Sequence, residues 1–158
     1  MSGLTQPGGS GASVLGALIA TASVTGTFSP TLSFNTPGNL SVSYALQSGV
    51  YKLIGDLVWI SLRLTCTPTH TTASGAAKIG GLPFVAAASP QASLSVVVAS
   101  AVTFPAGCTD AQAYIDVATG DLRLNGSGST VALASWDIAQ FPTTVARDIL
   151  VTGCYRRA

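Results

Sequence analysis

The sequence predicts an all-β protein, an antiparallel β-sandwich of the general kind that includes jelly rolls. The chain has no Glu and only two Lys, so common surface helix formers are missing, whereas Val, Thr, Ser and Gly are abundant. Apolar and polar residues alternate over short segments, and Gly- and Asn-rich turn signals separate these segments. With 158 residues, the chain has the length of one domain that can bury a core.

Charge is scarce along the chain. Charged residues make up 8% of the sequence, against roughly 25% in typical soluble domains, and polarity comes instead from 18 Ser and 18 Thr. The net charge of +1 provides no electrostatic footprint for nucleic acid, so we expect no nucleic-acid partner. A hydroxyl-rich surface lacks the charge repulsion that keeps monomers apart, and it suits a protein that packs against copies of itself.

Residues 1–25 differ from the rest and are interpreted as an N-terminal anchoring arm ahead of a knob domain at 26–158. The arm is Gly- and Ser-rich at first and then apolar, and no charge occurs before Lys52. Its apolar run is too short to span a bilayer and no basic segment precedes it, so we expect neither membrane insertion nor a cleaved signal. The predicted anchoring side chains are Val14, Leu15, Leu18 and Ile19. The alternative is a first strand folded back onto its own domain.

The clearest strand pattern covers residues 57–66. Val58, Ile60, Leu62, Leu64 and Cys66 alternate with polar or aromatic residues, which predicts one buried face and one face of different character. Before this strand, Gly55 and Asp56 are expected to form the turn of a hairpin.

The remaining elements follow in order. Residues 93–104 read as a long apolar strand, and residues 136–141 as one helical turn that Pro142 ends. Three segments at 111–117, 121–125 and 130–135 form a predicted meander, and a last strand is expected at 148–155.

No catalytic or metal site is predicted, and the chain is not expected to be an enzyme or to need a cofactor. His70, the single histidine, lies in a Thr-rich run without a neighbouring acid and is expected in an exposed loop. The six Asp are scattered, although a pair meeting in the fold or across subunits stays open. Cys66, Cys108 and Cys154 have no C-x-x-C spacing and are expected to be free thiols.

Four residues stand out as candidates for ligand or interface contacts: Trp59, Tyr114, Arg63 and Arg123. Trp59 lies opposite the apolar face of its strand, and core or subunit contact is favoured over ligand stacking. The two arginines interrupt apolar strands, and we expect each to pair with an Asp of the same or a neighbouring subunit.

Three motifs in order resemble a known family. They are G-T-F-S-P-T-L-S-F at 26–34, then Tyr44 followed by G-V-Y-K-L-I-G-D-L-V at 49–58, and I-G-G-L-P-F at 79–84. Together they resemble the C-terminal head domains of bacteriophage tail-fibre and head-fibre (capsid decoration) proteins. The resemblance covers roughly residues 26–155, which is most of the chain.

This resemblance implies a jelly-roll-like sandwich that forms a homotrimer on a virion assembled in the host cytoplasm. The major capsid protein or another virion protein is then the expected partner of the arm. Such heads usually follow a long shaft, and the short arm favours a knob fixed directly to a capsid or tail. The alternative role is a tail-tip protein that binds a receptor or a host-surface glycan.

Overall fold

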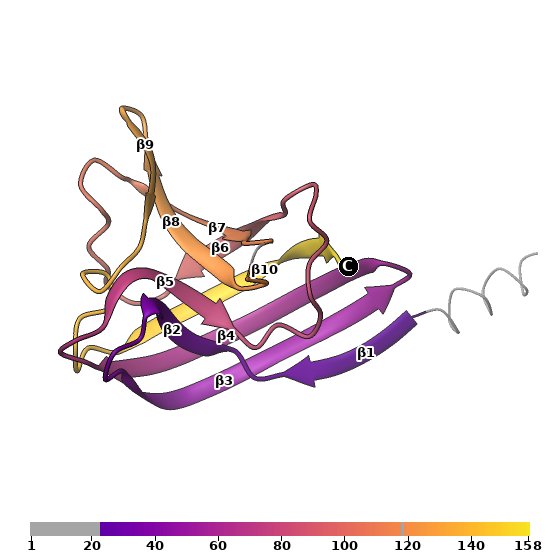
Figure 1. Cartoon of the computed structure of the whole chain (residues 1–158), viewed down its shortest axis with the longest axis horizontal. Coiled ribbons are helices and arrows are strands. Elements are labelled where there is room, and N and C mark those ends of the chain that lie inside the picture. The colour runs from indigo at the N-terminus through magenta and orange to yellow at the C-terminus, as the bar shows by residue number, and fades with distance from the viewer. Residues whose placement is uncertain (1–22, 118) are drawn as a thin grey trace, which may run out of the picture.

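A computed structural model describes residues 23–117 and 119–158, and every strand pairing in it is antiparallel (Figure 1). The strands are β1 (Ser23–Phe28), β2 (Thr31–Thr36), β3 (Ser41–Ile54), β4 (Leu57–Thr69), β5 (Ser74–Gly80), β6 (Ser93–Val98), β7 (Asp110–Ile115), β8 (Leu122–Gly128), β9 (Val131–Ser135) and β10 (Arg147–Arg156). No helix occurs among the described residues. The predicted all-β, antiparallel class is confirmed.

The strands form one continuous sheet that curls back on itself. Its order is β1-β3-β4-β10-β6-β7-β8-β5-β2, and β9 pairs with β8 off this path. Figure 1 shows β1 and the long strands β3, β4 and β10 side by side as one wall, with the other strands folded over it. The predicted jelly-roll arrangement is not confirmed by this order, because all the strands belong to one curled sheet.

The long wall is organised by the β3–β4 hairpin. Gly55 has φ of 63°, the left-handed conformation that glycine adopts without a steric penalty, and it makes the predicted turn with Asp56. β10 then pairs with β4 over its whole length, from Arg147 opposite Cys66 to Arg156 opposite Leu57.

Two glycine–aromatic pairs fix the register of the edge strand β1 on β3. Gly26 lies opposite Tyr51 and Phe28 opposite Gly49. A Cβ atom on Gly26 would approach the Tyr51 ring to 2.6 Å, and one on Gly49 would approach the Phe28 ring to 2.7 Å. Each ring therefore covers a bare glycine on the neighbouring strand and stabilises this pairing.

The core lies between the two walls of the curled sheet. Alternating residues of β4 supply one side, and Val58, Ile60 and Leu64 are completely buried. Aromatic rings fill the other side, where Phe34, Trp136 and Phe141 are also completely buried. Their centroids lie about 6 Å apart in edge or tilted geometry, which suits aromatic packing.

Several predicted elements match their observed counterparts. The meander is β7, β8 and β9, with β7 paired to β8 and β8 to β9, and the last strand is β10. The sheet begins at Ser23, so residues 23–25 of the predicted arm lie in β1. Val14, Leu15, Leu18 and Ile19 lie outside the described residues.

Two predictions were wrong in detail. The apolar run from 93 ends as a strand at Val98, because the chain makes its last bond to β10 at Ala99 and then turns away through Pro105 and Gly107. Residues 136–141 form hydrogen-bonded turns, with Gln140 N donating to Asp137 O and Phe141 N to Ile138 O, and no helical turn.

Candidate interaction surface

The most distinctive surface is the outward side of β1, β3, β4, β10 and β6, which we call the Trp59 face. Among the described residues, eleven large apolar side chains are exposed, and six of them lie on this one face. They are Leu46, Val50, Ile54, Leu57, Trp59 and Val97. Trp59 is 42% exposed and Val97 58% exposed. Apolar side chains gathered in this way on one flat face are typical of an interaction surface.

The strand period explains how these residues come together. In β4, the residues at 58, 60, 62, 64 and 66 face the core, which leaves Leu57, Trp59, Ser61, Arg63 and Thr65 on the outside. Register then aligns outward residues across strands, with Trp59 between Lys52 of β3 and Cys154 of β10. The sequence pattern therefore placed Trp59 correctly opposite the apolar core residues.

Charges on the Trp59 face occur mainly as pairs within the chain. The Arg63 Nε and Nη2 atoms donate to the two carboxylate oxygens of Asp148 at 3.0 and 2.7 Å, and Thr65 Oγ1 donates to Asp148 Oδ1 at 3.1 Å. The hydrogen bond from Arg63 holds the pKa of the Asp148 carboxyl below its ordinary value. At the end of the face, Arg156 pairs with Asp56 at 2.6 Å.

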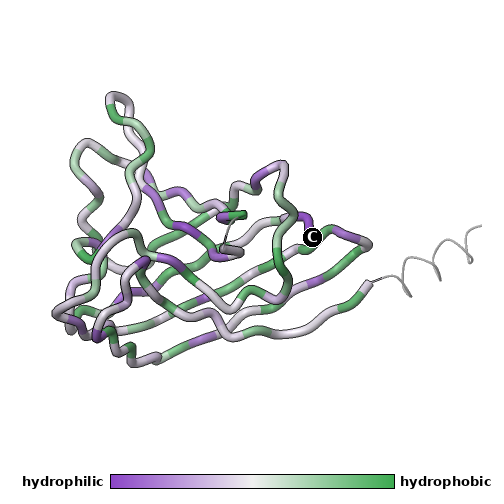
Figure 2. Tube along the Cα trace, viewed as in Figure 1, coloured by the Kyte–Doolittle hydropathy of each residue, from purple (hydrophilic) through white to green (hydrophobic). Residues whose placement is uncertain are grey.

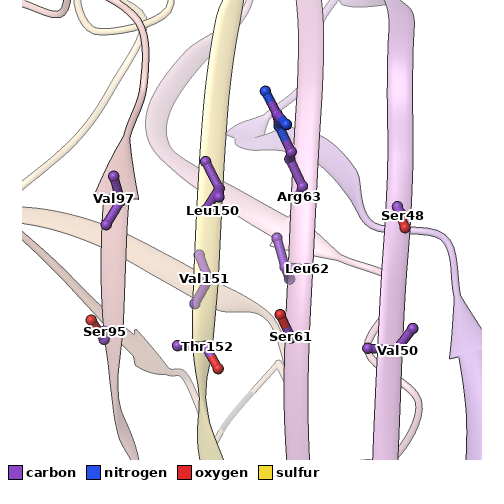
Figure 3. Close-up of a pocket in the computed structure, with 10 residues that line it drawn as sticks. All are labelled: Ser48, Val50, Ser61, Leu62, Arg63, Ser95, Val97, Leu150, Val151 and Thr152. Atoms are coloured by element: carbon purple, nitrogen blue, oxygen red, sulfur yellow. The ribbon is translucent and has the colours of Figure 1, made fainter.

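A shallow groove of about 320 Å³ runs over the centre of the Trp59 face (Figure 3). Short hydroxyl side chains on adjacent strands, including Ser61, Ser95 and Thr152, leave a depression between the larger side chains of Val50, Val97 and Leu150. Figure 3 shows these residues on β3, β4, β10 and β6, side by side across the sheet. The groove thus has apolar walls and hydroxyl groups along its floor, and its lining also includes the Arg63 side chain, which pairs with Asp148.

The other two predicted interface residues lie elsewhere, on the outward side of β7, β8, β5 and β2, which we call the Arg123 face. Tyr114 and Arg123 are cross-strand neighbours there. The Arg123 guanidinium donates to Asp116 Oδ2 at 3.0 and 3.1 Å and to Asn35 Oδ1 at 2.5 Å. With a side chain only 11% exposed, Arg123 is a structural link between β8, β2 and the β7–β8 connection.

The four predicted residues therefore form two pairs on two faces. Both arginines pair with an aspartate of their own chain, as expected from their position within apolar strands. Lys78 and Asp121 form a further pair at 3.1 Å on the Arg123 face.

The structure also identifies residues that sequence reasoning did not single out. The groove is lined by Val50, Val97 and Leu150. They lie on β3, β6 and β10, and for these strands no outward face was predicted from the sequence. The available signal was the strand alternation in β3 and β10.

His70 differs from the prediction of an exposed loop histidine. It is half-buried just after β4, its Nε2–H donates to the Phe141 carbonyl oxygen at 2.9 Å, and its ring packs edge-on against Phe34. Hydrogen bonds between the Thr-rich run and the 141–144 turn, from Thr144 N to Pro68 O and from His70 N to Thr143 Oγ1, explain this burial. The histidine is a structural contact of the aromatic core.

The three cysteines are free, as predicted. Burial raises the pKa of the Cys66 thiol to about 11, so this thiol stays protonated at neutral pH. Cys154 is exposed on the Trp59 face, and Cys108 is half-buried near the β6–β7 connection. Among the described residues, no three His, Cys, Asp or Glu side chains cluster to hold a metal ion.

Figure 2 shows that strongly hydrophilic positions are sparse and scattered over the trace, in agreement with the 8% of charged residues in the sequence. In the part of the chain that the structure describes, no helix is long and apolar enough to cross a membrane.

Comparison with known proteins places the fold. No protein-family model matches the sequence, and no curated protein sequence matches it significantly. The structure is similar to part of the Dettilon tailspike protein (gp208), with a TM-score of 0.61 and 18% identity over 85% of this chain. The match covers 24% of that chain, so this protein spans about a quarter of the tailspike's length. The likeness shows a shared spike-like all-β fold.

Proposed function

We propose that this protein is a structural subunit of a bacteriophage virion, a homotrimeric capsid-decoration or head-fibre knob. In this proposal, its N-terminal arm anchors it to the major capsid protein or another virion protein. The observation that supports a virion role is the fold shared with a tailspike over 85% of the chain, and the capsid location is proposed from the motif resemblance to head-fibre proteins. This fold agrees with the motif resemblance to phage fibre heads, and neither argument assigns catalysis to the chain.

The Trp59 face supports self-association. Six exposed apolar side chains on one side of the sheet favour a surface that is covered in the assembled particle. The start of β1 and the C-terminal end of β10 lie at the same end of the wall, beside the β3–β4 turn. The arm therefore enters the domain at one end, which leaves the rest of the knob free to project.

The arm is tested by changing Val14, Leu15, Leu18 and Ile19 to Ser in the full chain. We expect the variant to fold and to be lost from purified particles, because the apolar anchor is removed. Burial of four such side chains contributes on the order of 6–10 kcal/mol of gross transfer free energy. Mass spectrometry of virions measures incorporation, and Leu133→Ser is the control. Incorporation equal to that of the wild type rejects the anchor.

Location is tested by electron microscopy of virions labelled with an antibody against the knob. Label over the capsid is expected. Label on the tail contradicts capsid decoration and favours the second candidate function, a tail-tip protein that binds a receptor or host-surface glycan. The similarity to a tailspike is the observation that favours this second candidate. Binding of the purified protein to host cells or their surface polysaccharide measures it directly.

A further inference from the structure

We infer that the Trp59 face is the contact between copies of this chain, and that Trp59 of one copy packs into the central groove of the next. The inference rests on the homotrimer of the proposed function and specifies the surface that forms it.

The face carries both halves of such a contact. Trp59 projects from β4 with 42% of its surface exposed, although burial of an aromatic side chain is favourable. The groove begins one outward position further along the same strand, at Ser61. Its volume of about 320 Å³, with Val50, Val97 and Leu150 as apolar walls, is of the size that accepts one aromatic side chain.

A projecting group and its recess at different positions on one face give a heterologous contact, in which each copy inserts into the next. Contacts of this kind close into a ring when the rotation between copies permits it. A homotrimer is such a ring, and it covers Trp59 and the groove of every copy at once.

The charges on the face suit a second copy better than a charged partner. Arg63 with Asp148 and Arg156 with Asp56 are already neutralised in pairs, and Lys52 adds one positive charge. Two copies therefore meet without strong repulsion, and the hydroxyls of the groove floor need only neutral partners. A strongly acidic or basic partner finds little complementary charge here.

The dimensions of the face agree with a subunit contact. Three strands followed over the ten residues of β10, together with the six residues each of β1 and β6, span an area of roughly 700 Å² at about 3.4 Å per residue and about 4.8 Å between strands. This is about the surface that one partner buries in a standard protein interface. In a trimer two neighbours share it, so we expect association in the micromolar range.

The experiment measures the molar mass of the full chain by light scattering, from about 1 to about 100 µM. The knob variant is Trp59→Ser and the groove variant is Ser61→Arg, which places a long charged side chain in the recess. Leu133→Ser removes an equally exposed apolar side chain outside the face and is the matched control. Circular dichroism and thermal unfolding verify that each variant is folded.

We expect the wild type and Leu133→Ser to form trimers, and each face variant to raise the dissociation constant by about 30-fold or more, as for a central interface residue. A trimeric wild type whose folded face variants stay trimeric overturns the assignment of the face and leaves the proposed trimer intact. A wild type that stays monomeric over the whole range overturns both. If a face variant unfolds, the other variant decides the result.

Discussion

The two outer faces of the curled sheet use their charges and aromatic residues in opposite ways. On the Arg123 face, the guanidinium is 11% exposed and links three chain segments through Asp116 and Asn35. On the Trp59 face, Arg63 is 51% exposed and bonds one neighbouring strand, while Trp59 and Val97 face solvent. The arginine of one face is largely buried among side chains of its own chain, whereas the arginine of the other face is exposed beside apolar side chains. The contrast indicates which side of the molecule a partner covers.

The largest expected difference between the two faces is in the free energy of unfolding that is lost when their arginines are replaced. Arg123→Met is expected to lower the free energy of unfolding by about 2–3 kcal/mol, because it removes the hydrogen bonds that the largely buried guanidinium donates to Asn35 and Asp116. For a domain of this size the melting temperature then falls by about 5–10 °C.

Arg63→Met is the matched change on the Trp59 face, where we expect a much smaller loss than for Arg123→Met because the Arg63 side chain is exposed and its pair is screened by salt. Both variants are made in the Trp59→Ser background, so that subunit contacts do not contribute, and urea unfolding compares them. Equal losses of unfolding free energy at the two sites contradict the distinction between a largely buried Arg123 and an exposed Arg63.

A smaller effect concerns pH. The pKa of Asp148 is lowered by its hydrogen bond from Arg63, so the pair contributes stability above the unfolded pKa of about 3.9 and loses it as the pH falls through the folded pKa. Asp148→Asn is therefore expected to destabilise the protein by at most about 1 kcal/mol at pH 7 and to have a smaller effect near pH 2.

Urea unfolding at the two pH values measures this difference, with Asp110→Asn as the control because its carboxylate accepts a bond only from the neighbouring Thr109 side chain. An Asp148→Asn effect that grows on acidification refutes the assignment.

Features of the fold that depend on neighbouring residues could be predicted from the sequence, whereas features that depend on contacts between distant residues could not. The strict alternation at 57–66 shows which side of β4 is buried, because the side-chain period of a strand is local, and it placed Trp59 and Arg63 on the side opposite the core residues. The hairpin turn at Gly55 and Asp56 is local in the same sense.

Contacts between distant segments could not be inferred in this way. Asn35 meets Arg123 across 88 positions, and His70 meets the Phe141 carbonyl across 71. The early end of β6 at Val98 depends on where its partner β10 begins, at Arg147, and the apolar run up to Phe104 carries no local sign of it. The groove depends on the register of four strands, so its lining emerges only from the assembled sheet.

The central claim, that the Trp59 face is covered by a second copy, is tested most directly by thiol labelling of the wild-type protein. Cys154 is exposed in the single chain and lies opposite Trp59, whereas Cys108 lies away from the Trp59 face. Labelling with a maleimide, followed by peptide mass spectrometry, gives the rate at each cysteine in the concentrated and the diluted protein. We predict that Cys154 reacts at least about tenfold more slowly in the assembled protein, as for a group desolvated at an interface centre, while the rate at Cys108 stays the same. An assembled protein in which Cys154 reacts as fast as in the dissociated chain contradicts the account.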